Sequence, residues 1–323
     1  MTKYDVSALG ELLIDFTQSG LSSQGNPLFE ANPGGAPCNV LAMLEKLGRK
    51  TNFIGKVGDD AFGGQLEAAL KETGISTEGL VKDKDVHTTL ALVAKLPNGD
   101  RDFSFYRKPG ADMMLTADEV KTELIENAKI FHFGTLSLTD EPVKSATHKA
   151  VETAEKAGCV LSFDPNLREP LWNSLDEAHE QVEWGLNHCH VLKISDNEVV
   201  WFTGKQDYEE GMQAILKAHP GIVLADLSMG ADGSRSYYHG TRAAEVPAFL
   251  QEGTIETTGA GDTFCANILN GVLEYGLENL DEKKIEGMLT FANAAASLVT
   301  TRKGALRVMP SREEVEAFIA SRS

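Results

Sequence analysis

Short apolar runs alternate with segments of helical periodicity along almost all of the 323-residue chain. In the helical segments apolar residues recur every three or four positions, as Val40, Leu44 and Leu47 do before Gly48. Strands that alternate with helices favour an α/β fold with a mostly parallel sheet, whose ligands lie beyond the carboxyl ends of the strands. The expected strands lie at residues 4–11, 51–58, 129–134, 159–164, 190–195 and 221–227, and the expected helices at 36–47, 60–73, 141–157 and 207–218.

One region interrupts this alternation. Residues 88–107 contain two β-rich arms around Asn98 and Gly99, a pair of residues favoured in tight hairpin turns. We expect a small β-sheet lid made from about residues 15–33 and 87–108, standing off a single domain that spans residues 1–323. Because an uncovered sheet edge tends to associate, the same sheet is also a candidate surface for a homodimer.

The composition excludes several classes of partner. Thirty basic and 48 acidic side chains give a net charge of -18, which disfavours nucleic acids and anionic membrane surfaces. No apolar run approaches the ~18 residues of a membrane span, and Asp5 and Glu11 interrupt the apolar patch that a signal peptide would need. The four cysteines are scattered without a CxxC pair, as in reduced proteins. We therefore expect a cytoplasmic protein.

Several familiar catalytic motifs are absent from the sequence. It has no GxxxxGK[ST] phosphate loop and no HRD or DFG triplet of protein kinases. Phe264 stands where a dinucleotide-binding GxGxxG would have its third glycine, which argues against a nicotinamide-dependent dehydrogenase. His188 and His190 have no further metal ligand nearby in the sequence, so no metal site is expected there.

The most informative segment is a glycine turn that leads into an apolar helix. Gly259, Ala260 and Gly261 let the backbone approach a ligand closely, and the helix that follows directs free N–H groups into the turn. Asp262, in the first helical turn, is placed either to accept a proton beside a bound phosphoryl group or simply to cap the helix. In either role the helix dipole is expected to keep the pKa of Asp262 low.

Six segments, in order along the chain, carry a resemblance to a known family. The sequence resembles the PfkB (ribokinase-like) sugar kinases and, within them, most closely the fructokinases. The family's carboxy-terminal signature appears as ETTGAGD at residues 256–262. The other matching segments are residues 32–48, 105–113, 164–172, 291–295 and 303–305. The resemblance implies a ribokinase-like three-layer sandwich.

The resemblance also implies residues for the sugar and for catalysis. It makes Asp262 the general base and the turn formed by Gly259, Ala260 and Gly261 the anion hole. Carboxylates and amides direct several hydrogen bonds to hydroxyl groups, and guanidinium groups bind either sugar or phosphate oxygens. The residues implied in substrate binding are Asp15, Gly34, Gly35, Asn39, Arg107 and Arg168.

Other residues are expected to bind the nucleotide. The glycine-containing turn after the strand at 221–227 suits a phosphate or adenosine contact, and Lys193 suits a phosphate. By resemblance, Asn293 lines the adenine pocket, and Glu198 takes part in magnesium binding, indirectly. The implied set is Lys193, Glu198, Ser228, Gly230, Gly233 and Asn293.

The chain departs from the family pattern at two positions. Ribokinases have an Asn-x-x-Glu motif, whereas here Ser195 replaces the asparagine and only Glu198 is kept. Glu256 replaces the usual aspartate at the start of the carboxy-terminal signature. Because that position belongs to a potassium site in some relatives, the change argues against activation by a monovalent cation.

The sequence therefore predicts an ATP-dependent sugar kinase that phosphorylates a primary hydroxyl of fructose, with Mg²⁺ on the triphosphate. One alternative is a 2-keto-3-deoxygluconate kinase, in which Arg107 and Arg168 would pair with the carboxylate of the substrate. A second alternative, from another class, is a non-catalytic sugar-binding homologue of these kinases.

Overall fold

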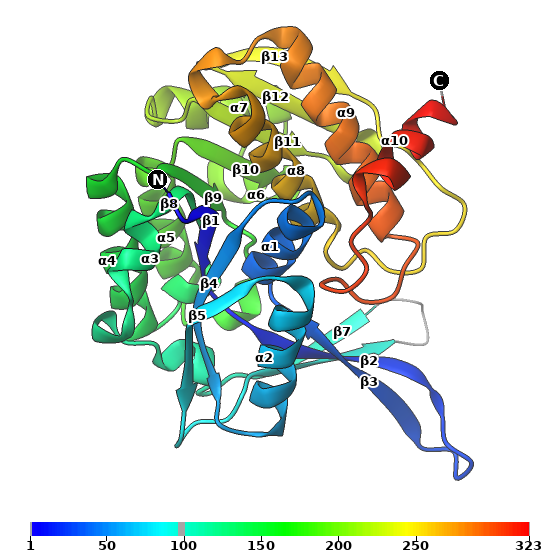
Figure 1. Ribbon diagram of the computed structural model, residues 1–323. Coiled ribbons are helices and arrows are strands. Elements are labelled where there is room, and N and C mark those ends of the chain that lie inside the picture. Colours follow the sequence, from blue (N-terminus) through cyan, green and yellow to red (C-terminus); the bar gives the residue numbers. More distant parts are fainter. Residues whose placement is uncertain (1, 96–100, 323) are drawn as a thin grey trace.

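A nine-stranded sheet forms the centre of the molecule in the computed structural model, which describes residues 2–95 and 101–322 (Figure 1). Seven neighbouring strands are parallel, and two antiparallel strands extend one end of the sheet. The strand order is β13 (Thr241–Val246), β12 (Ser234–Tyr238), β11 (Leu224–Ser228), β10 (Val191–Ser195), β9 (Val160–Asp164), β8 (Ala128–Gly134), β1 (Tyr4–Leu9), β4 (Thr51–Gly58) and β5 (Ser76–Asp83).

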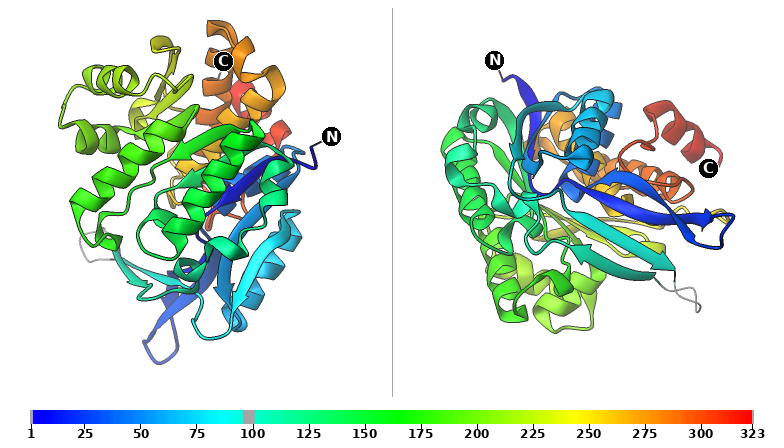
Figure 2. Two further views of the ribbon diagram at one scale, coloured as in Figure 1. Left: turned by 90° about the vertical axis from the view of Figure 1, so that its left-hand side faces the viewer. Right: turned by 90° about the horizontal axis from the view of Figure 1, so that it is seen from below.

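Helices cover both faces of this sheet, so the expected three-layer α/β sandwich is confirmed (Figures 1 and 2). All eight residues of β4 are buried, as a parallel strand covered on both faces requires. One face packs against α1 (Ala36–Lys46), α2 (Ala61–Thr73), α8 (Ala260–Tyr275), α9 (Glu282–Val299) and α10 (Arg312–Ala320). The other packs against α3 (Thr122–Glu126), α4 (Val143–Ala157), α5 (Leu175–His188), α6 (Asp196–Thr203) and α7 (Tyr208–Ala218).

A separate four-stranded sheet projects from the sandwich, as Figure 2 shows. Its order is β3 (Pro27–Gly34), β2 (Leu13–Leu21), β6 (Leu90–Lys95) and β7 (Arg101–Tyr106). β2 and β6 pair in parallel and thereby join two segments that are distant in the sequence. The small sheet predicted from these segments is present, while the predicted turn at Asn98 and Gly99 lies outside the described residues.

The structure also bears on the membrane-spanning segments and the cysteines considered in the sequence. Within the described ranges, no helix is long and apolar enough to cross a membrane. The four cysteines, Cys38, Cys159, Cys189 and Cys265, are all buried and unpaired.

Candidate active site

Two cavities meet at the turn that precedes α8. The first has a volume of about 420 Å³ and the second about 370 Å³, and both are lined by Thr257 and Gly261. Glu11 after β1, Leu136 after β8 and Arg168 after β9 line the first cavity, while Ser228 at the end of β11 lines the second. Both cavities therefore lie at the carboxyl ends of the parallel strands, where the sequence predicted the ligands.

The backbone of this turn depends on its glycines. Gly259 precedes α8 with a φ of 79°, and a Cβ there would lie only 2.8 Å from the Cβ of Ala305. Gly259 lines the first cavity, Ala260 the second and Gly261 both. The amino-terminal turn of a 16-residue helix thus lies at the junction of the cavities, where its free N–H groups favour an anion.

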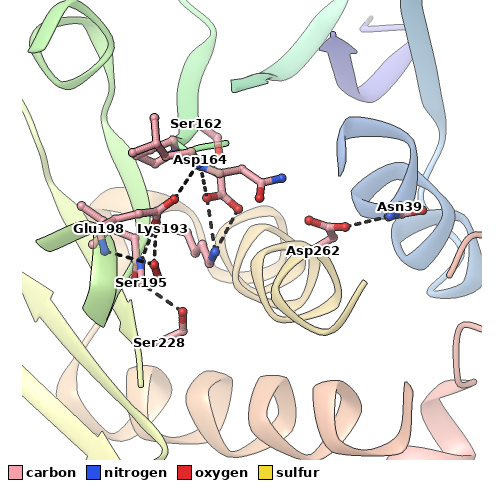
Figure 3. Close-up of polar contacts among 12 residues, drawn as sticks. Asn39, Ser162, Asp164, Lys193, Ser195, Glu198, Ser228 and Asp262 are labelled. Carbon is pink, nitrogen blue, oxygen red and sulfur yellow. Dashed lines mark hydrogen bonds and ion pairs between the residues drawn. The ribbon is translucent and has the colours of Figure 1, made fainter. Parts of the chain in front are cut away.

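Asp262, the third residue of α8, lies in the wall of the first cavity (Figure 3). Asn39 on α1 donates a hydrogen bond from Nδ2 to Oδ2 of Asp262, over 2.8 Å. Burial raises the pKa of Asp262, although Asn39, Lys193 and Arg168 oppose this shift. The expectation of a low pKa was therefore wrong, because the loss of hydration outweighs the favourable charges and dipole around this carboxyl.

Four of the six expected substrate-binding residues line the same cavity as Asp262, namely Asp15, Gly35, Asn39 and Arg168. Burial, assisted by the charge of Glu256, raises the pKa of Asp15 to about 7. Gly34 lies behind this carboxylate, and a Cβ at Gly34 would collide with it. Gly35 has a φ of 127° and no room for a side chain against the backbone carbonyl of Glu11.

The two arginines occupy different surroundings. Arg168 is exposed, lines the first cavity and donates hydrogen bonds to the carbonyl oxygens of Asn166 and Leu167. Arg107 is buried behind the wall of the cavity, with its Nε 2.7 Å from Oδ2 of Asp112. Its other nitrogens donate to Thr139 Oγ1 and to the carbonyl oxygen of Leu136. The structure thus brings Arg168 to the cavity but does not bring Arg107.

Four of the residues predicted for the nucleotide line the second cavity, namely Ser228, Gly230, Gly233 and Asn293. Gly230 and Gly233 have φ values of 54° and 97°, which favour glycine. Asn293 donates from Nδ2 to the carbonyl oxygens of Val246 and Pro247, at 3.1 and 3.2 Å. Asn293 therefore holds the chain that forms one edge of this cavity.

Lys193 and Glu198 lie elsewhere. Lys193 lines the first cavity, and its ammonium forms a buried ion pair with Asp164 (Figure 3). Glu198 contributes to neither cavity, because both of its carboxylate oxygens are occupied within the chain. The backbone N–H and hydroxyl of Ser195 donate to Oε2, and the N–H of Leu167 donates to Oε1, each over 2.8 Å.

The sequence pattern of the family described as "pfkB family carbohydrate kinase" matches residues 3–312. This chain belongs to that family. The resemblance seen in the sequence is therefore confirmed over nearly the whole kinase.

Individual relatives of this kinase are fructokinases by name. It is 40% identical to "Probable fructokinase-2" of Arabidopsis thaliana over 319 residues, which cover 97% of this chain and 95% of that protein. It is also 40% identical to "Fructokinase-1" of Zea mays, over 97% of each chain.

Solved structures support the same fold. The fructokinase with bound ATP from Xylella fastidiosa superposes with a TM-score of 0.89, at 29% identity and over 98% of each chain. A fructokinase from Vibrio cholerae O395 with bound fructose, ADP and calcium ion gives a TM-score of 0.86 at 28% identity, over 98% of this chain and 99% of that one. The ribokinase-like fold of this kinase is thereby confirmed.

Sequence reasoning missed one of the four carboxyl groups that line the first cavity of this kinase. Glu11 is buried there, and its Oε1 accepts the N–H of Ala36 at the start of α1, over 2.7 Å. Burial raises the pKa of Glu11 to about 7. The sequence could have indicated this role, because Glu11 lies two residues after the end of the first parallel strand, where ligands are expected. In the sequence, Glu11 was considered only as a charge that argues against a signal peptide.

Proposed function

We propose that this kinase transfers the γ-phosphoryl group of ATP to a primary hydroxyl of fructose. The observation that carries the proposal is the position of Asp262, in the wall of one cavity and beside the glycine turn shared with the other. The names of the relatives and the ATP and fructose bound in similar structures support the choice of substrates.

The geometry supports a direct transfer. Fructose occupies the first cavity, where the hydroxyl oxygen lies near Asp262, and ATP occupies the second with its phosphates toward residues 259–261. The hydroxyl oxygen bonds to the γ-phosphorus as the bond from this phosphorus to the bridging oxygen of ADP breaks, and the hydroxyl proton passes to the carboxylate of Asp262. The N–H groups of the turn and the ammonium of Lys193 stabilise the negative charge on the phosphoryl oxygens.

The charges around the first cavity favour a neutral sugar over a sugar acid. Glu11, Asp15, Glu256 and Asp262 all line it, whereas Arg107 is committed to Asp112 behind its wall. A substrate carboxylate would meet like charges and would lack the pair of free arginines that a keto acid needs.

We therefore expect fructose to exceed 2-keto-3-deoxygluconate in kcat/KM by roughly 100-fold or more, since unfavourable charge contacts cost several kcal/mol. ADP release with MgATP measures this, on a panel that also contains ribose, tagatose and adenosine. A higher kcat/KM for the keto acid would contradict the choice of fructose. No release with any sugar would favour the non-catalytic homologue.

Magnesium is expected to reach the site with the nucleotide. Among the residues that the structure describes, no three His, Cys, Asp or Glu side chains are gathered to hold a metal ion. The carboxylate of Glu198 is already occupied by three donors, so it fits only an indirect role through water. Such a site suits Mg²⁺, which is usually held by substrate phosphates and water with few protein ligands.

The proposed reaction includes no monovalent cation. The carboxylate of Glu256 accepts the hydroxyl of Thr258 over 2.7 Å and the N–H of Gly304 over 3.3 Å. These hydrogen bonds join residues 256–258 to the loop at 304 and occupy both carboxylate oxygens of Glu256. The ADP assay repeated in potassium-free buffer tests this, because a large loss of activity would contradict it.

The small sheet is proposed as a lid over the sugar. β2 contributes Leu13, Asp15 and Thr17 to the first cavity, and β7 contributes Phe105. Fructose is expected to slow hydrogen exchange in residues 88–95 and 101–107, because a closed lid shields its backbone amides. Unchanged exchange at saturating fructose would remove the lid from the proposal.

The same sheet is proposed as the surface of a homodimer. It exposes apolar side chains, which a partner would cover. They are Leu21, Leu28, Phe29 and Tyr106. Sedimentation equilibrium of wild type and Leu21→Ser at micromolar concentration tests this. A wild-type protein that is monomeric, with the same mass as Leu21→Ser, would contradict the dimer.

A further inference from the structure

Lys193 lies on β10 between two acidic residues on the neighbouring strands. Asp164 ends β9 on one side, and Asp226 of β11 pairs in register with Lys193 on the other. The ammonium of Lys193 lies 3.2 and 3.1 Å from Oδ1 and Oδ2 of Asp164. Asp226 instead accepts the hydroxyl of Ser236 on β12. Of the two flanking carboxyl groups, Lys193 therefore forms its ion pair with that of Asp164.

The position of the ammonium matters for the reaction. Lys193 lines the first cavity, and a Cβ added to Gly261 would lie 3.3 Å from its Nζ. The charge is thus held against the backbone of the turn where the two cavities meet. Figure 3 shows the side chains of Lys193 and Asp164 pointing toward each other, with Asp262 and its partner Asn39 farther away.

Asp164 is itself held in place. The backbone N–H of Asn166 donates to Oδ1 of Asp164 over 3.2 Å, and the side chains of Asp164 and Lys193 are only 4% and 8% exposed. A lysine has a flexible four-carbon stem, so a fixed carboxylate is needed to define where a buried ammonium lies. Asn166, two residues after the end of β9, lines the first cavity as well.

Asp164 also bears on the charge of Lys193. Burial alone would lower the pKa of this lysine, but the carboxylates of Asp164, Glu198 and Asp262, with the thiol of Cys265, raise it above its usual value. Without the negative charge of Asp164, the pKa of Lys193 would fall, because burial favours the neutral amine.

We propose that Asp164 is a positioning residue for phosphoryl transfer, which fixes the charged ammonium of Lys193 against the glycine turn. The proposal rests on the proposed function of Lys193 as a charge that stabilises the transferred phosphoryl group. Asp164 acts through Lys193 and not on the sugar, so its removal lowers kcat more than it changes the KM for fructose.

The test compares Asp164→Asn with the matched control Asp226→Asn. Each change removes one buried carboxylate beside Lys193 and keeps the size of the side chain. For Asp164→Asn we expect kcat to fall roughly 10- to 100-fold with the KM for fructose changed less than about threefold, as for other residues that orient a functional group. In Asp164→Asn the alkaline fall of kcat also begins at a lower pH than in wild type, because loss of the Asp164 carboxylate lowers the pKa of Lys193 and the amine loses its proton sooner. For Asp226→Asn, kcat and its pH profile stay close to wild type.

A double-mutant cycle with Lys193→Met separates positioning from folding. If Asp164 acts through Lys193, adding Asp164→Asn to Lys193→Met lowers kcat no further. The double variant has two neutral residues at these positions and so avoids an unpaired buried charge, even where Asp164→Asn alone folds poorly. Equal losses in Asp164→Asn and Asp226→Asn, or an additive loss in the cycle, would overturn the proposal. A wild-type enzyme inactive on fructose would instead refute the proposed function. Full kcat in Lys193→Met would refute the role of this lysine, and the positioning proposal with it.

Discussion

Replacing Asp262 with asparagine is expected to lower kcat by roughly 10² to 10⁴, the range for loss of a positioned general base. Asparagine keeps the size of the side chain and an oxygen that can accept the hydrogen bond from Asn39, but it cannot take the hydroxyl proton. Because burial raises the pKa of Asp262, the wild-type kcat should also fall as the pH drops through that pKa and the base becomes protonated. Steady-state kcat with fructose and MgATP measures both effects.

The same variant distinguishes a base from a purely structural residue, since Gly259 is the N-cap of α8 and Asp262 is its third residue. Asparagine can still accept the hydrogen bond from Asn39, so a structural role predicts near-native kcat and an unchanged melting temperature. As a base, Asp262→Asn keeps its melting temperature and binds MgATP as well as wild type or better, since a negative charge near the triphosphate is gone. Near-native turnover by a folded Asp262→Asn enzyme would leave this residue only a structural role, through its hydrogen bond with Asn39.

Gly34→Ala is expected to raise the KM for fructose by roughly 10- to 100-fold. The new Cβ would occupy the space of the Asp15 carboxylate and push it out of position. A hydrogen bond to a charged group contributes about 1.5–3 kcal/mol, and each 1.4 kcal/mol corresponds to about tenfold in affinity. Fructose titrations of the initial rate measure the KM.

Gly20→Ala is the matched control for this substitution. Gly20 lies on β2 in the same small sheet, and a Cβ there would meet no atom within 4 Å. Gly34→Ala should fold, because the displaced group is the end of a side chain and not the backbone. If both variants keep the wild-type KM, Asp15 does not bind the sugar in the way proposed.

The sandwich could be predicted because its information is local in the sequence. A strand such as β4, buried along its whole length, has an apolar run that ends at glycine, and helices with one apolar face follow such strands. The sequence placed residues 15–33 and 87–108 in one small sheet, but nothing in either segment specified that β2 and β6 pair in parallel. The antiparallel strands β12 and β13 were also missed, since β12 has only five residues and three of the six residues of β13 are exposed.

In the site, too, residues that are contiguous in the sequence could be predicted, whereas contacts made only by folding could not. The glycine turn and Asp262 are contiguous, so the residues themselves indicated an anion site with a carboxylate beside it. Arg107 was expected at the substrate, but its partners come from Asp112 and from the segment after β8, and only the folded chain reveals that they enclose it. The pKa of Asp262 was misjudged because the helix dipole can be inferred from sequence whereas burial cannot.

The most direct test of the account follows the phosphoryl group itself. Wild-type enzyme and Asp262→Asn are incubated side by side with fructose and MgATP, and ³¹P NMR records the products. Wild type is expected to form ADP and a phosphomonoester on a primary carbon of fructose in equal amounts, while Asp262→Asn forms the same products far more slowly. ADP accompanied by inorganic phosphate in place of the sugar phosphate, or the same rate in both proteins, would contradict it.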